Sequence, residues 1–229
     1  HAALRTVLGG HARQAGSLVA PDRLRFDFSH GQPLTPEQLE EVQRLVTEAI
    51  LENAPLTIVE KPRRQAEAEG AMALFGETYG DVVRTISIGS PARFSYELCG
   101  GTHVPATGVI GPFVIVREES VGAGIRRIEA LTGREAQAYF ERTGGTLQRV
   151  AALLETTPDR ADAQLEVLLR ERKALETRLQ ELERSAAQVR LEELPQETIG
   201  PARALLGLIP NCSADDLRRL SDPFRSENP

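Results

Sequence analysis

The sequence predicts an α+β fold with a mixed or antiparallel sheet, followed by a long helical coiled-coil segment. Up to residue 133, short strand patterns mix with helical ones, without the regular repetition of a parallel βαβ sheet. Strand patterns are absent from residues 134–194, where a heptad of apolar residues begins at Leu165. Hydrophobic residues make up 41% of the 229 residues, which is enough for an ordinary globular core and excludes a disordered chain.

Local patterns place the elements of residues 1–133. Residues 1–9 read as a short helix that ends at a glycine pair. Apolar and charged residues alternate over 23–29, which predicts a half-buried strand. Thr35 can cap a helix, and Gln38 completes a capping box. A further helical pattern covers residues 65–73, and strand patterns cover residues 56–60, 82–88, 94–98, 113–116 and 126–131.

The second part of the chain reads as helical. A Pro-Asp pair at 158–159 predicts a turn between two helices. The heptad seam consists of Leu165, Leu168, Leu175, Leu179, Leu182, Ala186 and Val189. Arg172 is its one polar position, and Pro195 ends it. We therefore predict an α+β domain over 1–133, a helical or coiled-coil linker over 134–195, and an incomplete further domain over 196–229. In that last piece, residues 202–209 read as a strand or short helix, and a capped helix runs to about Leu220.

Charge and composition limit the classes of function. The formal net charge of −6 argues against a generic, charge-driven nucleic-acid binder, although a local basic patch remains possible. No apolar run is long enough to span a bilayer. The only two cysteines, Cys99 and Cys212, stand far apart in the sequence, which favours a reducing cytoplasm over a disulfide framework. Both ends of the chain read as cut.

The sharpest chemical feature is the pair Cys99 and His103, which flanks Gly-Gly-Thr. A thiolate and an imidazole at this spacing form a natural half-site for zinc, and the glycines let the backbone fold tightly. A Cys–His nucleophile pair and an incidental buried cysteine are the alternatives. The other histidines are His1, His11 and His30, and none has metal-ligand spacing to another. On physical grounds the chain therefore holds half a metal site.

Two further segments offer polar chemistry. Gln14 and Ser17 supply neutral donors and acceptors that suit a water or a hydroxyl-bearing substrate, or else they form a polar turn before the first strand. Arg126 and Arg127 follow a glycine-rich turn and suit phosphate or ribose contact. The alternative for these arginines is a surface strand that pairs with acidic neighbours.

Five stretches taken together resemble the editing domain of alanyl-tRNA synthetases. They are HAALRTVLGGHARQAGSLVAPDRLRFDFSH, GAMALFGETYGD, ELCGGTHV, TGVIGPF and GAGIRRIEALTG, in that family's order and spacing within residues 1–133. The resemblance implies the mixed or antiparallel-sheet editing fold of the alanyl and threonyl synthetases. The remaining residues resemble the helical linker and the start of the C-terminal domain. That continuation separates the chain from freestanding editing proteins.

The resemblance implies hydrolysis of tRNA(Ala) mischarged with serine or glycine. In that family, zinc is held by an HxxxH motif together with the Cys and His that match Cys99 and His103. The HxxxH motif would lie just upstream of His1. Gln14 and Ser17 match the polar wall of the editing pocket, and together with Cys99 they are the catalytic residues that the resemblance implies. Arg126 and Arg127 match a motif that we expect near the tRNA end.

The resemblance also defines the alternatives and the partners. The aminoacylation site, which uses ATP, Mg²⁺ and alanine in the parent enzyme, lies upstream of the matching region. The alternative function is a catalytically inactive module that binds tRNA(Ala) and forms a homodimer through the coiled coil or the C-terminal domain. We expect a cytoplasmic protein with no membrane partner.

Overall fold

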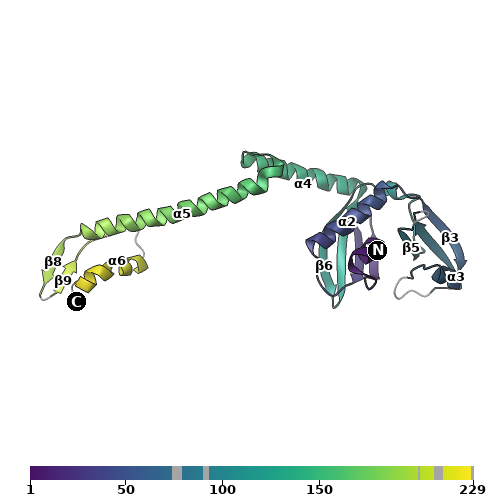
Figure 1. Cartoon of the computed structure of the whole chain (residues 1–229), viewed down its shortest axis with the longest axis horizontal. Coiled ribbons are helices and arrows are strands. Elements are labelled where there is room, and N and C mark those ends of the chain that lie inside the picture. Colours follow the sequence, from purple (N-terminus) through teal and green to yellow (C-terminus); the bar gives the residue numbers. More distant parts are fainter. Residues whose placement is uncertain (74–78, 90–92, 201, 209–213, 228–229) are drawn as a thin grey trace. The chain divides into compact units, whose positions relative to one another are not determined.

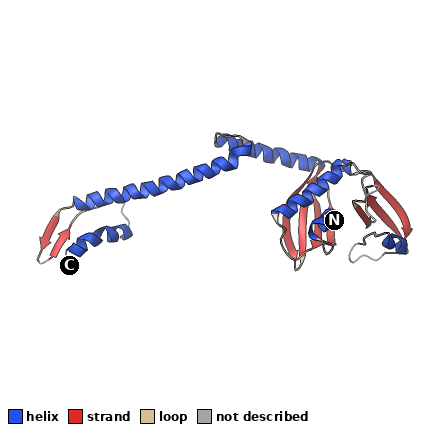
Figure 2. Cartoon of the chain, in the orientation of Figure 1, coloured by secondary structure: helices blue, strands red, loops and turns tan. Residues whose placement is uncertain are grey.

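The computed structural model describes residues 1–73, 79–89, 93–200, 202–208 and 214–227 (Figure 1). Cys212 lies outside these residues. The chain divides into two compact units, His1–Gly145 and Thr146–Pro229. Helices and strands mix in the first unit, and helix dominates the second (Figure 2). The α+β prediction is confirmed.

A four-stranded antiparallel sheet forms the centre of the first unit, in the order β1-β2-β7-β6. Its strands are β1 (Gln14–Val19), β2 (Leu24–Ser29), β6 (Phe113–Gly122) and β7 (Ile125–Thr132). Two helices, α1 (Ala2–Leu8) and α2 (Pro36–Leu51), pack on one face of this sheet. Leu4, Phe28, Val42 and Ile128 belong to the shared core. The predicted capping box of Thr35 and Gln38 starts α2.

A second, three-stranded antiparallel sheet has the order β3-β4-β5. Its strands are β3 (Leu56–Pro62), β4 (Val82–Ile88) and β5 (Ser95–Leu98), and the short helix α3 (Arg63–Ala68) follows β3. Ala66, Val83 and Leu98 make its core. The 3-10 helix η1 (Thr107–Ile110) is tied to α2, because the buried Thr107 hydroxyl donates to the Ala49 carbonyl at 2.5 Å.

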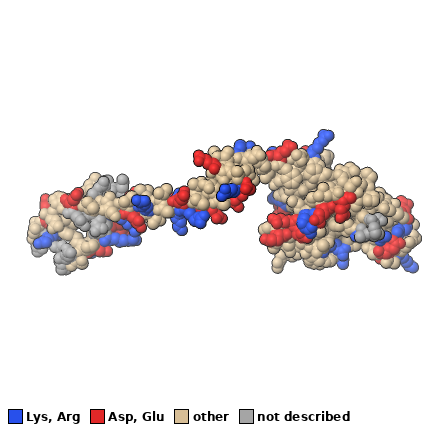
Figure 3. All heavy atoms as spheres, turned by 45° about the horizontal axis from the view of Figure 1, so that its top comes forward, with Lys and Arg blue, Asp and Glu red and all other residues tan. Residues whose placement is uncertain are grey.

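The second unit is built on helices. It contains the end of α4 (Gly133–Leu153), the 3-10 turn η2 (Pro158–Arg160) and the long helix α5 (Ala161–Glu192). A hairpin of β8 (Gln196–Ile199) and β9 (Ala202–Leu205) follows, and then α6 (Ala214–Glu227). The turn at 158–159 was therefore predicted correctly. Acidic and basic side chains are mixed over the visible face of each unit (Figure 3).

The structure corrects several local predictions. Residues 14–17 are not a turn before the first strand, because they form β1, an edge strand held by its ladder with β2. Its sequence, QAGSLV, lacks the alternation of apolar and charged residues that predicted the strand over 23–29. Helix α3 ends at Ala68 instead of residue 73, and α6 continues past Leu220 to Glu227 with Pro223 inside it.

No helix of the described residues is long and apolar enough to cross a membrane.

A polar cluster fastens α3 and its following turn to the second sheet. The Lys61 ammonium donates to Glu69 Oε2 at 2.6 Å, and the Tyr96 hydroxyl donates to the same oxygen at 2.8 Å. The Gln65 amide donates to Glu69 Oε1 at 2.9 Å. These hydrogen bonds, that of Lys61 first, lower the pKa of the Glu69 carboxyl to about 2.

We predict that Glu69→Gln reduces the loss of stability in acid. A carboxyl whose pKa is lowered by folding contributes stability above its ordinary value of 4.5, and this contribution is lost as the pH falls towards about 2. The free energy of unfolding of the variant should therefore depend less steeply on pH in this window, as measured by urea denaturation. Glu67→Gln, on the same helix in an exposed pair with Arg63, is the control. Identical pH profiles for wild type and Glu69→Gln would contradict the prediction.

Candidate active site

The loop that carries Cys99 and His103 is fixed by an arginine of the neighbouring strand. It begins directly after β5, whose last residue, Leu98, is fully buried. The Cys99 amide donates to the Arg84 carbonyl at 3.2 Å. The Arg84 guanidinium donates back to the carbonyls of Cys99 at 3.0 Å and Gly101 at 2.6 Å. These bonds hold the loop in a tight turn against β4.

Cys99 and His103 face one small space above Gly101. A Cβ atom on Gly101 would lie 3.4 Å from Cys99 Sγ and 3.9 Å from His103 Nε2. Cys99 forms no disulfide with a described residue, and its Sγ accepts a hydrogen bond from the Gly101 amide at 3.4 Å. His103 Nε2 is buried without a hydrogen-bond partner. A thiolate and an imidazole nitrogen converging on one point are a donor set that suits zinc. The two residues therefore fit half of a zinc site.

Burial favours the neutral form of this imidazole. Desolvation, and then the charge of Arg84, lowers the pKa of His103 below its ordinary value. The neutral ring keeps a nitrogen lone pair, which a metal ligand needs. Within the described residues, no group of three or more His, Cys, Asp or Glu side chains could hold a metal ion.

His1 links β5, directly before this loop, to the segment that precedes β1. Its Nδ1 lies 3.0 Å from Glu97 Oε1, and its Nε2 lies 3.2 Å from the Ala12 carbonyl oxygen. The Ser95 hydroxyl donates to the same Glu97 oxygen at 3.1 Å. Glu97 stands two residues before Cys99, and Ala12 two residues before Gln14. No feature of the sequence points to this connection, because His1 and Glu97 are 96 positions apart.

Gln14 and Ser17 form a pair on β1. The Gln14 side-chain amide donates to Ser17 Oγ at 3.1 Å. A bulge between Gln14 and Gly16 makes this possible, since residues three apart point to opposite faces of a regular strand. Among the described contacts, no hydrogen bond links this pair to Cys99 or His103.

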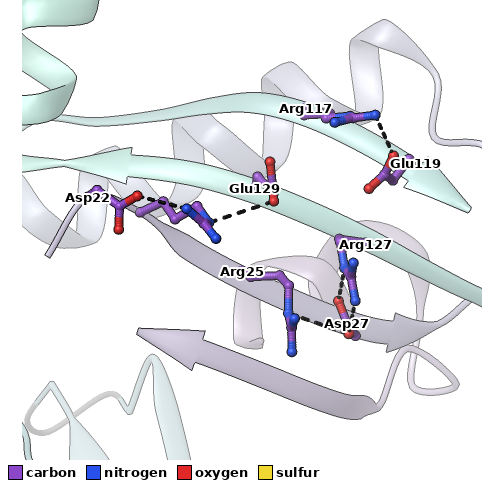
Figure 4. A network of polar contacts seen from close by, with 8 residues as sticks. Asp22, Arg25, Asp27, Arg117, Glu119, Arg127 and Glu129 are labelled. Carbon is purple, nitrogen blue, oxygen red and sulfur yellow. Dashed lines mark hydrogen bonds and ion pairs between the residues drawn. The ribbon is translucent and has the colours of Figure 1, made fainter. Parts of the chain in front are cut away.

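Arg126 and Arg127 both make ion pairs within the sheet. Arg126 binds Glu118 through Nε and Nη2, and both side chains are nearly buried. Arg127 binds Asp27 through two nitrogens, at 2.7 and 2.8 Å (Figure 4). The hydrogen bonds from Arg127 lower the pKa of the Asp27 carboxyl. A contact of these arginines with tRNA stays a prediction, and it would use the N–H groups that the carboxylates leave free.

The exposed face of the sheet carries a checkerboard of charge (Figure 4). Across three strands, one row reads Asp27, Arg127 and Glu119, and the next reads Arg25, Glu129 and Arg117. Opposite charges that face each other across strands stabilise a sheet by about 0.2–1 kcal/mol per pair. The rows therefore favour this register of β2, β7 and β6.

A histidine pair was missed by the sequence prediction. His11 and His30 have no metal-ligand spacing in the sequence, yet His11 Nε2 lies 2.9 Å from His30 Nδ1 and the rings stack. The backbone brings them together, since the Ser29 hydroxyl donates to the His11 carbonyl at 2.5 Å. The His30 amide donates to the Gly124 carbonyl at 2.9 Å, at the turn of the β6–β7 hairpin.

Comparison with known proteins identifies close relatives. Residues 83–129 match the family model described as the threonyl and alanyl tRNA synthetase second additional domain. The chain is 43% identical to alanine–tRNA ligase of Geobacillus kaustophilus, over 99% of this chain and 26% of that protein. It is 45% identical to the enzyme of Roseiflexus castenholzii and 44% identical to that of Mesorhizobium japonicum, each over 99% of this chain and 27% of the relative.

We predict that Arg127→Gln destabilises the first unit by about 1.5–3 kcal/mol, because it removes hydrogen bonds to a carboxylate that is largely buried. Arg117→Gln is the matched control on the same face. Its side chain is 62% exposed and paired with Glu119, so its loss should cost less than about 1 kcal/mol. Urea denaturation of both variants measures the difference. Equal costs would show that the Asp27 pair contributes no more than a surface contact.

Proposed function

The chain belongs to the alanyl-tRNA synthetase family and spans 26% of its Geobacillus relative, and on that premise we propose that residues 1–133 hydrolyse mischarged tRNA(Ala). The bond cleaved is the ester between tRNA and serine or glycine. The observation that carries the proposal is the convergence of Cys99 Sγ and His103 Nε2 above Gly101. The tRNA synthetase family model covers the same strands and loop.

The proposed site distinguishes serine from alanine by its hydroxyl. The side-chain nitrogen of Gln14 already donates to Ser17 Oγ. The Ser17 O–H and the side-chain oxygen of Gln14 are then left to bind a ligand. One donor and one acceptor complement the hydroxyl of a seryl group. An alanyl group would leave both unpaired, and a site built around a hydroxyl rejects an analogue that lacks it. This pair therefore accounts for selectivity towards the seryl ester and not for cleavage of the glycyl ester.

The zinc fit suggests how the ester would be held. Cys99 and His103 would supply two ligands, and the HxxxH motif of the resemblance would supply the others. When bound, zinc would polarise a water or anchor the amino group or ribose hydroxyl of the substrate. The protein's own part is to hold the backbone of Cys99 and Gly101 through Arg84, and to keep His103 neutral by burying it.

A need for hydrolysis follows from the limits of a small synthetic pocket. An aminoacylation pocket that accepts alanine distinguishes it from glycine by only about 1–3 kcal/mol of binding free energy. Such a pocket also cannot strongly reject serine, which adds only a hydroxyl. A second site that removes these products would correct both errors. Attachment of alanine with ATP and Mg²⁺, the tRNA(Ala) partner and a cytoplasmic location are proposals for the whole enzyme.

The direct test of this function is hydrolysis of Ser-tRNA(Ala) by this chain, with Ala-tRNA(Ala) as the control substrate. We expect Ser-tRNA(Ala) to be cleaved much faster than Ala-tRNA(Ala), because only the seryl hydroxyl satisfies Gln14 and Ser17. Equal cleavage of both esters would refute the assigned pair. If the chain is inactive, the same assay in the whole enzyme decides whether the upstream motif is required.

In the whole enzyme, Cys99→Ala should lower clearance of Ser-tRNA(Ala) by about 100-fold or more, because even outer contacts of a metal site are worth 10- to 100-fold. Gly101→Ala keeps both donors but places a methyl group in the space between them. Both variants should lose bound zinc, measured by elemental analysis, while alanylation stays at the wild-type rate. Full zinc content together with unchanged clearance in Cys99→Ala would exclude the assigned role.

A second candidate function is a dimerising, tRNA-binding module, which the seam of α5 favours. Its leucines face solvent in the single chain: Leu175 is 66% exposed, Leu179 57% and Leu182 59%. An apolar stripe at heptad spacing is the pattern that a second helix covers in a coiled coil. We therefore propose that α5 pairs with α5 of a second copy.

Sedimentation of the chain tests this pairing. We expect a dimer at micromolar concentration, and a monomer for the double variant Leu175→Glu and Leu182→Glu, because each glutamate would bury a charge in the seam. Thr177→Glu, an exposed position outside the seam, should remain dimeric. A wild-type monomer at all concentrations would mean that the heptad closes within one chain.

A further inference from the structure

A polar cavity of about 340 Å³ lies between α1 and the start of β5. Arg5 and Thr6 line it from α1, and Arg93, Ser95 and Tyr96 line it from the other side. No aspartate or glutamate is among its lining residues. The cavity is therefore positively charged in a chain whose net charge is −6.

The two arginines are the unused donors of this cavity. Arg5 Nε is buried and has no hydrogen-bond partner, and neither arginine makes an ion pair within the described residues. The hydroxyls beside them are already committed, since Thr6 donates to the Ala2 carbonyl at 3.1 Å and Ser95 donates to Glu97. A ligand of this cavity must therefore accept hydrogen bonds from guanidinium groups, as the oxygens of a phosphate or a carboxylate do.

Arg93 is held in place by an aromatic ring. Its guanidinium carbon lies 4.1 Å from the centroid of the Tyr96 ring. The Tyr96 hydroxyl is itself fixed by its bond to Glu69 at 2.8 Å. A guanidinium stacked on a ring keeps its N–H groups in its own plane, directed away from the ring. Arg93 is thus oriented to donate without losing much side-chain entropy.

An aromatic surface completes the cavity. Phe94 lines it and is 37% exposed. Paired cationic groups beside an exposed ring are the arrangement by which proteins hold single-stranded nucleic acid, with the phosphate on the cations and the base on the ring. A free inorganic phosphate would make no use of Phe94.

The cavity adjoins the candidate active site. Arg5 stands one helical turn after His1, and its amide donates to the His1 carbonyl at 3.1 Å. Ser95 and Glu97 share one face of β5, and Cys99 follows two residues later. Ser95 to Cys99 is four residues, or about 13 Å of extended chain. This is the distance scale of one or two nucleotides.

We propose that this cavity binds a nucleotide of the single-stranded 3′ end of an RNA, with its phosphodiester on Arg5 and Arg93 and its base on Phe94. The inference rests on the proposed function, since the ester that the active site would cleave is carried by such an end. Binding in this cavity would direct the terminal ribose of the RNA towards Cys99 and His103. Arg5, Arg93 and Phe94 are accordingly positioning residues for the reaction.

The probe is a fluorescein-labelled RNA tetranucleotide, ACCA, which carries no ester, titrated into the whole chain by fluorescence anisotropy at several salt concentrations. Arg5→Gln and Arg93→Gln should each weaken binding about tenfold. Each should also reduce the slope of log K against log salt by about 0.7, the value for one lost contact to a single strand. Phe94→Leu should weaken binding about fivefold or more with an unchanged salt slope. Arg64→Gln, an exposed arginine of α3 outside the cavity, is the matched control and should bind as wild type.

Circular dichroism and thermal unfolding confirm that each variant is folded. Wild-type affinity in both Arg5→Gln and Arg93→Gln would overturn the subsite, and so would an equal loss in Arg64→Gln. A loss in the arginine variants with full binding by Phe94→Leu would overturn the nucleotide assignment in favour of a plain anion site. Because the probe has no ester, arginine-dependent binding together with no hydrolysis of Ser-tRNA(Ala) by the whole enzyme overturns only the proposed function. Hydrolysis with arginine-independent binding overturns only the subsite.

Discussion

The pairing of β2 with β7 is the constraint on which the rest of the first unit depends. It joins residues 100 positions apart, and each face of the pair fixes the same register. Phe28 and Ile128 are buried on the face under α1 and α2, while Asp27 and Arg127 pair on the other face. A slip by one residue would exchange these faces, burying the charges and exposing the core. Both the buried core and the ion pair on the opposite face therefore fix the register of the sheet on which the helices pack.

Helix α1 connects the central sheet to the candidate active site. Its packing on the sheet places His1 between the Ala12 carbonyl and Glu97. One turn later it directs Arg5 to the cavity beside β5. The loop with Cys99 and His103 is held separately, by Arg84 of β4. The candidate site therefore combines residues held from two sides: the His1 ring by Glu97 and Ala12, and the Cys99 backbone by Arg84.

Charge in this protein acts locally. The overall balance is negative, and most basic side chains of the central sheet are matched by carboxylates in the rows of β2, β7 and β6. Arg126 and Arg127 belong to this matched set. Arg5 and Arg93 do not, within the described residues, which is why the cavity and not the arginine-rich strand is the better place for a phosphate.

The sequence by itself determined what depends on neighbours along the chain. The capping box of Thr35, the strand over 82–88 and the turn at 158–159 are set by local backbone preferences, and the Cys99–His103 spacing places two donors on one tight loop. Only the tertiary structure decided what depends on distant residues. It formed β1 from a segment with no alternation, because an edge strand takes its stability from its partner's hydrogen bonds. It also paired His11 with His30 and His1 with Glu97, contacts that no spacing in the sequence encodes, since they exist only once the strands are in register.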